Sequence, residues 1–476
     1  MSTRNFLIMT GGILAVLFIL LGFAIRAELN EGTPETAEAP KEESSEEPAE
    51  EQTTDTKEET KENGTAALNL NEGPLYAVDK NTDPVFQYQS GVDIAYPEAG
   101  VKGIFVTGFT AGGERMQELI DLVNSTDLNS MVIDVKEDIG DIMMPLDVDN
   151  EIAQSYMHDY INPEDLMTTL EDNQIYPIAR IVVFKDSRLA AERPDLSYQN
   201  SDGTVWQNGS GESFVNPFLK EVWDYNVDIA IEAAKLGFKE IQFDYVRFPE
   251  AFESLSSELT YDFGEYADTE ADEVQQRVNA VTDFVAYANE QLEPYDVDVS
   301  VDVFGYAATQ REAPGIGQNF SQIASNVDVI SSMIYPSHWG AGAFDYAAPD
   351  TEPYSVVDEY MKVENEVLGA LDSPPKSRPW LQDFTASYLG PGNYLNYGAE
   401  EVEAQIQALK DNGVYEYLLW NAKIRIQKEH NINKFHKETP AGKVSDSRGF
   451  RLYEFIALMY IISLKLCRMK LNFATY

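Results

Sequence analysis

The stretch Glu240-Ile-Gln-Phe-Asp-Tyr-Val-Arg-Phe-Pro249 has the composition of a buried β-strand that ends among charged side chains. Side chains alternate between the two faces of a strand, so Phe243 and Tyr245 are predicted on one face and Gln242 and Asp244 on the other. Removing a carboxylate from water is costly, so an inward-facing Asp244 needs a structural or catalytic reason. An arginine and a proline follow, which predicts that the strand ends where the charged groups gather.

Seven further stretches share this layout, and helical patterns lie between them. The predicted strands span 103–108, 130–136, 176–185, 240–248, 297–306, 328–335, 378–385 and 416–421. The predicted helices span 114–124, 163–173, 217–236, 271–292, 317–326, 355–371 and 398–412. Strands that alternate with helices in this way predict an α/β fold, the (β/α)8 TIM barrel. An open doubly wound sheet is the alternative, but no Gly-x-Gly-x-x-Gly turn follows the first strand.

The carboxyl ends of the strands carry the chemistry in such a barrel. Asp244 and Asp302 lie on adjacent predicted strands with inward parity. Glycoside hydrolysis needs two carboxyl groups across the scissile bond, so we predict Asp244 as nucleophile or base and Asp302 as general acid. Arg247 would keep a neighbouring carboxylate ionised, whereas the apolar Phe304 near Asp302 would favour a protonated carboxyl.

The same strand ends supply large aromatic and polar side chains, which suit sugar binding. Aromatic rings stack on the apolar faces of pyranose rings, while carboxylates and guanidinium groups bind the hydroxyls. The predicted substrate-binding residues are Asp134, Lys136, Arg180, Arg247, Tyr335, His338, Trp339, Trp380, Gln382, Asp383 and Trp420. Structural roles are the alternative: Asp134 and Lys136 could form an internal ion pair, Arg247 could serve only to hold Asp244, and the three tryptophans could be core residues.

The composition argues against several other classes of protein. The 476 residues are 43% hydrophobic, enough for a sizeable core, and carry a formal net charge of −47. Phosphate binding needs clustered Lys and Arg, so no nucleic-acid partner is predicted. The four histidines and the single Cys467 have no metal-ligand spacing, so neither a metal nor a cofactor is predicted. The lack of metal-binding histidines also argues against a polysaccharide deacetylase.

The two ends of the chain differ from the barrel pattern. Residues 6–25 form an apolar run of membrane-spanning length that follows Arg4, so 1–27 are predicted to be a cytoplasmic start and a transmembrane anchor. A cleaved signal peptide, and hence secretion, is the alternative. Residues 28–72 are rich in Glu, Thr, Pro, Ala and Ser and predict a disordered acidic linker. The barrel domain is then 73–422, held outside the cell membrane by a single-pass anchor.

The tail 423–476 is basic, with eleven Lys and Arg against four Asp and Glu. It also contains the cysteine and a short apolar run that two charged residues interrupt. A second membrane segment is one interpretation of this run. Our preferred hypothesis is that the tail comes from a shifted reading frame and is not part of the evolved domain.

Several ordered blocks resemble a bacterial family of glycoside hydrolases with TIM-barrel folds. The blocks are Lys102-Gly-Ile-Phe-Val-Thr-Gly108, Val132-Ile-Asp-Val-Lys-Glu-Asp138, Ala179-Arg-Ile-Val-Val-Phe184, Gln242-Phe-Asp-Tyr-Val-Arg-Phe-Pro249, Met333-Ile-Tyr-Pro-Ser-His338 and Tyr417-Leu-Leu-Trp-Asn421. The resemblance covers about 100–421 and implies that Asp244 is the nucleophile and Asp302 the acid. The chain departs from the family after Asn421, where a last helix is expected and none is evident, which would weaken closure of the barrel.

The sequence thus predicts a membrane-anchored, extracytoplasmic glycoside hydrolase that acts on a cell-wall or extracellular polysaccharide. Two alternatives share the fold. One is a non-catalytic glycan-binding protein, which keeps the aromatic residues but lacks a working pair of acids. The other is a structural protein of the cell envelope whose barrel mouth is closed by its own loops.

Overall fold

A computed structural model describes residues 87–267 and 269–421 of the chain. The predicted anchor at 6–25, the linker at 28–72, the start of the domain at 73–86 and the tail at 423–476 lie outside the described residues. Among the helices of the described ranges, none combines the length and the apolar character that a membrane crossing requires.

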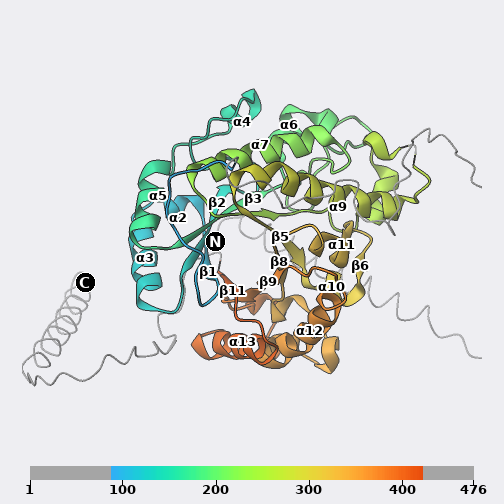
Figure 1. The fold of residues 1–476 in the computed structure, drawn as a ribbon. Helices are drawn as coiled ribbons and strands as arrows, with labels where there is room; N and C mark the ends of the chain where they lie inside the picture. The colour runs from blue at the N-terminus through green and yellow to red at the C-terminus, as the bar shows by residue number, and fades with distance from the viewer. Residues whose placement is uncertain (1–86, 268, 422–476) are drawn as a thin grey trace, which may run out of the picture. The chain divides into compact units, whose positions relative to one another are not determined.

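Eight parallel strands close into a barrel, so the predicted (β/α)8 architecture is confirmed (Figure 1). They are β1 (Lys102–Val106), β2 (Ser130–Lys136), β3 (Tyr176–Val182), β4 (Glu240–Asp244), β5 (Asp298–Phe304), β8 (Val329–Met333), β10 (Trp380–Gln382) and β11 (Tyr417–Trp420). The ring closes where β11 pairs with β1 and where Trp380 of β10 pairs with Met333 of β8. The strands thus complete the ring, and the last helix expected after Asn421 would fall outside the described residues. The short β9 (Lys376–Ser377) pairs with β8 just before β10.

Helices follow the strands and cover the outside of the barrel (Figure 1). The longer ones are α3 (Met116–Ser125), α5 (Pro163–Asp172), α7 (Lys220–Leu236), α9 (Glu273–Leu292), α12 (Pro353–Leu368) and α13 (Ala399–Asp411). Side-chain caps fix some of their starts: the carboxylate of Asp272 accepts hydrogen bonds from two backbone N–H groups of α9. Gly237, with φ of +114°, ends α7 in the left-handed conformation that favours glycine.

Short elements lie in the connections at the carboxyl ends of the strands. They include α2 (Gly108–Ala111), α4 (Glu151–Ser155), α6 (Ser187–Glu192), α8 (Phe252–Leu255), α10 (Gly305–Gln310) and α11 (Phe320–Ala324). The helix predicted at 317–326 is shorter in the structure, because its first residues pair in a hairpin of β6 (Glu312–Ala313) and β7 (Gln318–Asn319). These connections are long after β2, β3, β4 and β8, and they form the walls above the barrel mouth.

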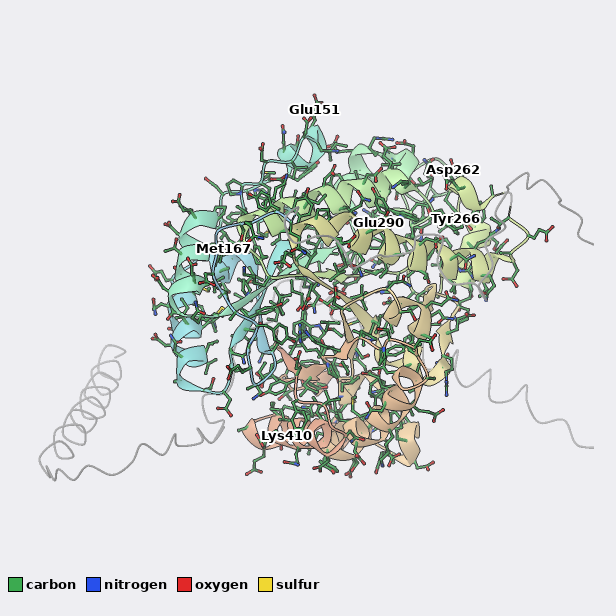
Figure 2. The ribbon with its side chains drawn as sticks, viewed as in Figure 1. Glu151, Met167, Asp262, Tyr266, Glu290 and Lys410 are labelled. Atoms are coloured by element: carbon green, nitrogen blue, oxygen red, sulfur yellow. The ribbon has the colours of Figure 1, made fainter. Side chains whose placement is uncertain are left out.

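Two hydrophobic clusters stabilise the fold. The larger one lies between the strands and the surrounding helices and includes Met167 of α5. The smaller one fills the barrel interior and includes Phe105, Val132, Ile178 and Trp380. Charged side chains such as that of Glu151 lie on the outer surface (Figure 2). The barrel is therefore a packed core, and the space for a ligand lies at its end.

Candidate active site

A cavity of about 290 Å³ opens at the carboxyl ends of the strands, where the sequence places the chemistry. It brings together eight of the predicted site residues: Arg180, Asp244, Arg247, Asp302, Tyr335, His338, Trp380 and Trp420. Five further residues complete its lining: Asp138, Tyr245, Glu250, Phe304 and Met333. The site thus draws on β2, β3, β4, β5, β8, β10 and β11 or on the residues just after them.

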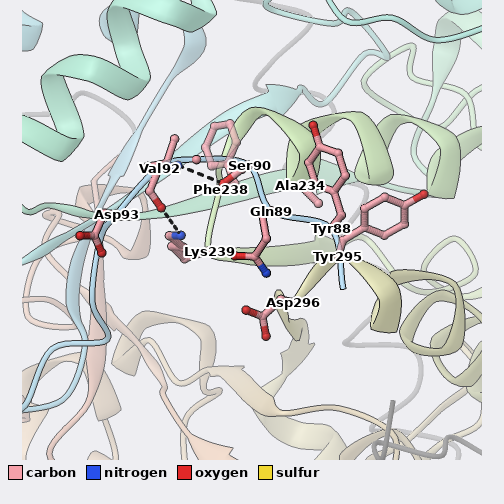
Figure 3. Close-up of a pocket in the computed structure, with 11 residues that line it drawn as sticks. Tyr88, Gln89, Ser90, Val92, Asp93, Ala234, Phe238, Lys239, Tyr295 and Asp296 are labelled. Atoms are coloured by element: carbon pink, nitrogen blue, oxygen red, sulfur yellow. Dashed lines mark hydrogen bonds between the residues drawn. The ribbon is translucent and has the colours of Figure 1, made fainter. Parts of the chain in front are cut away.

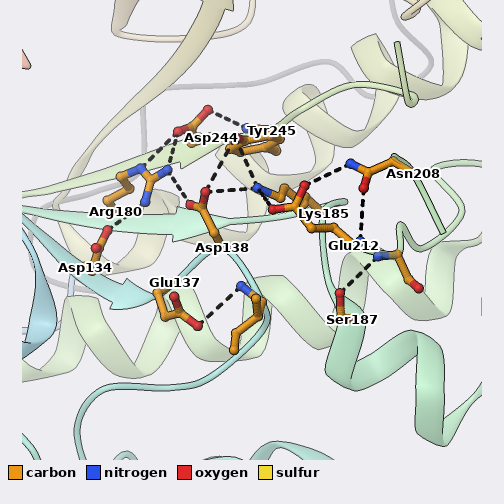
Figure 4. Close-up of polar contacts among 12 residues, drawn as sticks. Asp134, Glu137, Asp138, Arg180, Lys185, Ser187, Asn208, Glu212, Asp244 and Tyr245 are labelled. Carbon is orange, nitrogen blue, oxygen red and sulfur yellow. Dashed lines mark hydrogen bonds and ion pairs between the residues drawn. The ribbon is translucent and has the colours of Figure 1, made fainter. Parts of the chain in front are cut away.

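Asp244, the last residue of β4, is held through both carboxylate oxygens. Arg180 of β3 donates to Oδ2 of Asp244 from Nε at 2.9 Å and from Nη2 at 2.7 Å (Figure 4). The backbone N–H of Tyr245 donates to Oδ1 at 2.6 Å. The cation that holds Asp244 is therefore Arg180, whereas the sequence prediction named Arg247.

Tyr245 follows Asp244 with φ of +53°, a left-handed conformation that is uncommon for a residue other than glycine. This turn ends the strand at Asp244, four residues earlier than predicted. Tyr245 lines the cavity together with Asp244, so its predicted place on the same face as Phe243 is wrong. Strand alternation fails here because the backbone leaves the extended conformation. The hydroxyl of Tyr245 lies 3.4 Å from Nζ of Lys185.

Asp302, on the neighbouring strand β5, is buried and has a different environment from Asp244. Its Oδ1 accepts a hydrogen bond from Nε1 of Trp380 at 2.8 Å. Burial and, next in size, the negative charge of Asp244 raise the pKa of Asp302 well above its ordinary value. The site thus combines a carboxylate held by a guanidinium group with a carboxyl group whose protonated form is favoured.

Arg180 also organises the acids around Asp244 (Figure 4). Its Nη1 contacts Oδ1 of Asp134 at 2.7 Å, and its Nη2 contacts Oδ1 of Asp138 at 2.9 Å. Burial raises the pKa of Asp134 to about 7, against the opposing effect of Arg180. Burial also acts to raise the pKa of Asp138, but Arg180 and Lys185 outweigh it and hold this pKa below its ordinary value. Asp134 does not line the cavity, and within the described part of the chain its side chain contacts the site through Arg180.

Lys136 is not paired with Asp134, so the predicted internal ion pair is wrong. Its Nζ contacts Oδ2 of Asp186 at 2.7 Å, and both side chains are fully buried. Asp186 caps the start of α6. Strand alternation would put Asp134 and Lys136 on the same face of β2, but the pairing of β2 with β3 shifts register between these two residues. Lys136 therefore forms a buried ion pair with the connection after β3, outside the cavity.

Arg247 lies in the cavity wall among aromatic rings. Its guanidinium carbon is 4.9 Å from the ring centre of Tyr245, 5.0 Å from that of Phe304 and 5.6 Å from that of Phe214. Its ion pair is with Glu250, at 2.9 Å, and Asp244 pairs with Arg180 instead. The alternative that Arg247 only holds Asp244 is therefore wrong.

The other cavity residues present mostly apolar and aromatic surface. Tyr335, His338, Trp380 and Trp420 line one part of it. Burial lowers the pKa of His338, which favours its neutral form. The Trp380 and Trp420 rings meet edge to face, with centroids 5.4 Å apart. Trp380 is buried and Trp420 is partly exposed, so Trp420 is the ring of this pair that has surface open to a ligand.

Besides Asp134 and Lys136, three more predicted substrate-binding residues do not line the cavity. Trp339 packs against Phe344, with ring centroids 4.8 Å apart, and is partly buried against the main core. Gln382 is buried; it accepts from the N–H of Ser337 at 3.0 Å, which fixes the loop after β8. Asp383 is buried, and burial raises its pKa to about 7. For Trp339 the alternative of a core role agrees with the structure.

The residues that the prediction omitted carry weaker sequence signals. Tyr245 and Glu250 belong to or adjoin the quoted strand-four stretch, and Asp138 ends the strand-two block. Their nearness in sequence to Asp244 and Asp134 could have suggested them. Met333 is an apolar residue of a strand, and no pattern distinguishes it from core residues. Among residues 87–267 and 269–421, no cluster of three or more His, Cys, Asp or Glu side chains could hold a metal ion.

A second cavity, of about 280 Å³, lies at the opposite, amino-terminal end of the strands (Figure 3). The segment from Tyr88 to Asp93 forms one wall, and Phe238, Lys239 and Asp296 contribute to the rest. Nζ of Lys239 donates to the carbonyl oxygen of Val92 at 2.7 Å, which holds the segment in place. None of the predicted site residues lines this cavity.

Comparison with solved structures gives distant similarities. The chain is 32% identical to a hypothetical protein from Ruminiclostridium thermocellum, over 42% of this chain and 97% of that one, with a TM-score of 0.37. It is 14% identical to the PgaB (BpsB) glycoside hydrolase domain from Bordetella bronchiseptica, over 67% and 94%, with a TM-score of 0.49. It is 12% identical to the spore cortex-lytic enzyme SleL of Bacillus megaterium, over 69% and 72%, with a TM-score of 0.40.

None of the functionally curated proteins matches the chain. A family model described as "Putative glycosyl hydrolase domain" matches residues 103–426. This range holds all of the barrel strands apart from the first residue of β1. It also holds every residue that lines the candidate active site. The chain therefore belongs to this family of glycosyl hydrolases, and the enzyme class predicted from the sequence, a glycosidase, is confirmed.

Proposed function

We propose that this glycosidase cleaves a cell-wall or extracellular polysaccharide through Asp244 and Asp302, outside the membrane that anchors it. The proposal rests chiefly on one observation: two buried carboxyl groups on adjacent strands face one cavity and have different partners. Asp244 is paired with Arg180, at 2.7 Å, whereas Asp302 accepts a hydrogen bond from Trp380, at 2.8 Å. Burial and the charge of Asp244 raise the pKa of Asp302, which suits it to the role of general acid.

Each carboxyl group then has a defined step. Asp302 gives its proton to the glycosidic oxygen, so that the bond from this oxygen to the anomeric carbon can break. Asp244, ionised, either attacks the anomeric carbon or removes a proton from the water that does so. Arg180 acts as a positioning residue, because its two contacts fix the carboxylate of Asp244. Trp380 holds the Asp302 carboxyl through its indole N–H.

The polymer is proposed to lie across the aromatic part of the cavity. Trp420 and Tyr335 line it beside Trp380, and such rings bury apolar area against the faces of a sugar ring. The extracytoplasmic location is proposed from the sequence: an apolar run at 6–25 follows Arg4, and the acidic segment 28–72 would hold the barrel away from the membrane.

Hydrolysis of a panel of bacterial envelope polysaccharides by the full chain tests this proposal. Release of reducing ends is expected from the wild type, with a loss of about 100-fold or more in the Asp244→Asn and Asp302→Asn variants. Asp262→Asn, an exposed residue outside the cavity, is the matched control and should keep full activity. Wild-type rates in Asp244→Asn would contradict the assignment of the site. Binding of glycans with no hydrolysis by any of the proteins would favour a glycan-binding role on the same fold.

A further inference from the structure

We infer that the substrate of this site is an acidic sugar whose single negative charge binds to Arg247. The inference rests on the proposed function and extends it, since it names the class of glycan that the cavity recognises. The anionic group is a carboxylate, as in a uronic acid, or a sulfate ester, because both present one charge and paired oxygens to a guanidinium group.

The first observation is that the two guanidinium groups of the cavity differ in how far they are satisfied. Arg180 makes four hydrogen bonds to three carboxylates, those of Asp134, Asp138 and Asp244. Arg247 donates to the carbonyl oxygen of Phe248 at 3.1 Å and to Glu250 at 2.9 Å. A guanidinium group has five N–H donors, so three of those of Arg247 lack an acceptor among residues 87–267 and 269–421. Among these residues, Arg247 therefore has three donors left for a ligand, whereas Arg180 has one.

Arg247 is buried, but the carboxylate that pairs with it is exposed to solvent. The Arg247 side chain is 6% exposed, whereas that of its partner Glu250 is 68% exposed. A buried cation needs a compensating anion, and an ion pair to so exposed a carboxylate is weak. Glu250 thus contacts Arg247 from the solvent side. A substrate anion in the cavity would take over this contact and be shielded from water, which strengthens the interaction.

The third observation is the setting of Arg247 in the wall. The rings of Tyr245, Phe304 and Phe214 surround its guanidinium group, with centroids 4.9 to 5.6 Å away. Cation–π contacts and packing hold the group in one orientation, which suits recognition of paired oxygens. Phe304 is the last residue of β5 and stands two positions after Asp302, so an anion on Arg247 belongs to a sugar close to the reacting bond.

The charge of the surroundings limits the ligand to one negative charge. Arg247 contributes one positive charge, while Arg180 is neutralised by its own acids. The formal net charge of −47 repels an acidic polymer at long range. Preference for an acidic sugar therefore has to arise from this local contact, and it should disappear when Arg247 is replaced.

The test compares matched polymers. Values of kcat/KM and equilibrium binding are measured with the full chain on a uronic-acid polysaccharide and on its carboxyl-reduced form, which has the same linkages without the charge. A sulfated polysaccharide and its desulfated form make the second pair. The wild type is expected to prefer the charged member of one pair, and the Arg247→Gln variant to lose about tenfold or more of that preference. The pair that responds identifies the anionic group.

Two further variants complete the design. Arg193→Gln is the matched control, because Arg193 pairs with Asp195 and Glu221 on the surface outside the cavity. It should leave both activity and preference unchanged. Glu250→Gln removes the competing carboxylate from an exposed position and should lower KM for the charged polymer. This variant keeps the inference testable even if Arg247→Gln does not fold.

The outcomes separate the inference from the proposed function. If the wild type hydrolyses the neutral polymers as well as or better than the charged ones, the inference fails while the proposed function stands. The same holds if the preference for the charged polymer persists in Arg247→Gln. A KM for the charged polymer that rises in Glu250→Gln would also overturn it. Binding that prefers the charged polymer through Arg247, with no hydrolysis, would contradict the proposed catalysis and support the inference.

Discussion

Asp302 is the residue whose protonation state links the stability of the fold to its chemistry. Burial and the charge of Asp244 raise its pKa in the folded protein, while the pKa of an unfolded aspartate is about 3.9. The folded state therefore binds this proton more tightly. The resulting contribution to the free energy of unfolding is fully present below pH ~3.9 and is lost as the pH rises through the folded pKa.

The Asp302→Asn variant should remove this dependence. Asparagine is neutral at all pH values and can still accept the hydrogen bond from Trp380. The melting temperature of the variant, relative to wild type, should therefore increase as the pH rises above about 4 and level off once the pH passes the folded pKa of Asp302. Each tenfold change in the ionisation constant corresponds to about 1.4 kcal/mol. A difference in melting temperature that stays constant over this range would show that the carboxyl of Asp302 is ionised throughout.

The sequence predicted individual residues only where the backbone stays regular. Asp244 and Asp302 lie at inward positions of their strands, as alternation requires. Tyr245 was misplaced because alternation assumes an extended backbone, and its φ of +53° breaks that assumption. The predicted partner of Asp244, Arg247, was also wrong. The actual partner, Arg180, is far from Asp244 in sequence but lies opposite Gln242 on the neighbouring strand. The residue pattern along one strand does not reveal pairs between strands.

At the scale of elements, the end of α7 depends on a glycine. Gly237 has φ of +114°, and a Cβ added there would lie 2.4 Å from Cγ2 of Val92. Gly237→Ala should therefore lower the free energy of unfolding by more than the strain of a left-handed alanine alone. The added Cβ would also force the branched side chain of Val92 to shift. We expect a loss of about 2–4 kcal/mol, the sum of backbone strain and overpacking, measured by urea unfolding.

Gly413, just after α13, is the matched control for this prediction. It has φ of +78°, and a Cβ added there would meet no atom within 4 Å. Gly413→Ala therefore isolates the backbone term and should cost about 1–2 kcal/mol. Equal losses in the two variants would contradict a packing role for Gly237 against the segment that precedes the barrel.

The starts of strands were easier to predict than their ends, whereas for helices the ends agree at least as well as the starts, as for α7 and α9. The predicted start of α5 at Pro163 agrees with the structure, because the capping residue Asn162 and the proline mark it. Most predicted strands extend too far at the carboxyl end, as for 176–185 against Tyr176–Val182 in β3. Apolar residues continue past the last paired position there, so composition does not mark where the neighbouring strand stops pairing. The hairpin before α11 was missed because the predicted helix at 317–326 began too early and included the residues of β7.

At the scale of the whole molecule, a buried network joins the amino-terminal ends of the barrel strands. Arg378, between β9 and β10, contacts Glu240 at 2.5 Å, Glu416 at 2.8 Å and the hydroxyl of Tyr96 at 3.1 Å. Arg378 and Glu240 are both fully buried. The network thus connects the first residue of β4, the residue before β11 and the segment that leads into β1.

Removing the cation from this network should destabilise the entire barrel. Arg378→Met leaves Glu240 buried without its partner, at an expected cost of about 3–5 kcal/mol in the free energy of unfolding. The double variant Arg378→Met/Glu240→Gln should recover part of this loss, because the fully buried charge of Glu240 is removed while the partly exposed Glu416 remains. Chemical denaturation of the three proteins measures both effects. A loss below about 1 kcal/mol for Arg378→Met would mean that the network does not hold the barrel closed.

The architecture as a whole was predictable because the repeat of strand and helix is a periodic signal carried by many residues. The composition of the site was predictable in part, since the barrel places the strand ends at one mouth. The ion pairs of the site were not predictable, because they join residues that are distant in sequence and that come together only in the closed ring. Lys136 illustrates this: it lies two residues from Asp134 yet pairs with Asp186.

The most direct test of the two-carboxyl mechanism compares leaving groups. On the polysaccharide that the wild type cleaves, both Asp244→Asn and Asp302→Asn should be inactive. On an aryl glycoside of the same sugar, whose phenolate leaves without protonation, Asp302→Asn should regain most of the wild-type rate, because the general acid is no longer needed. Asp244→Asn should stay inactive on both substrates. Wild-type rates for Asp244→Asn on either substrate, or equal losses on both for Asp302→Asn, would contradict these roles.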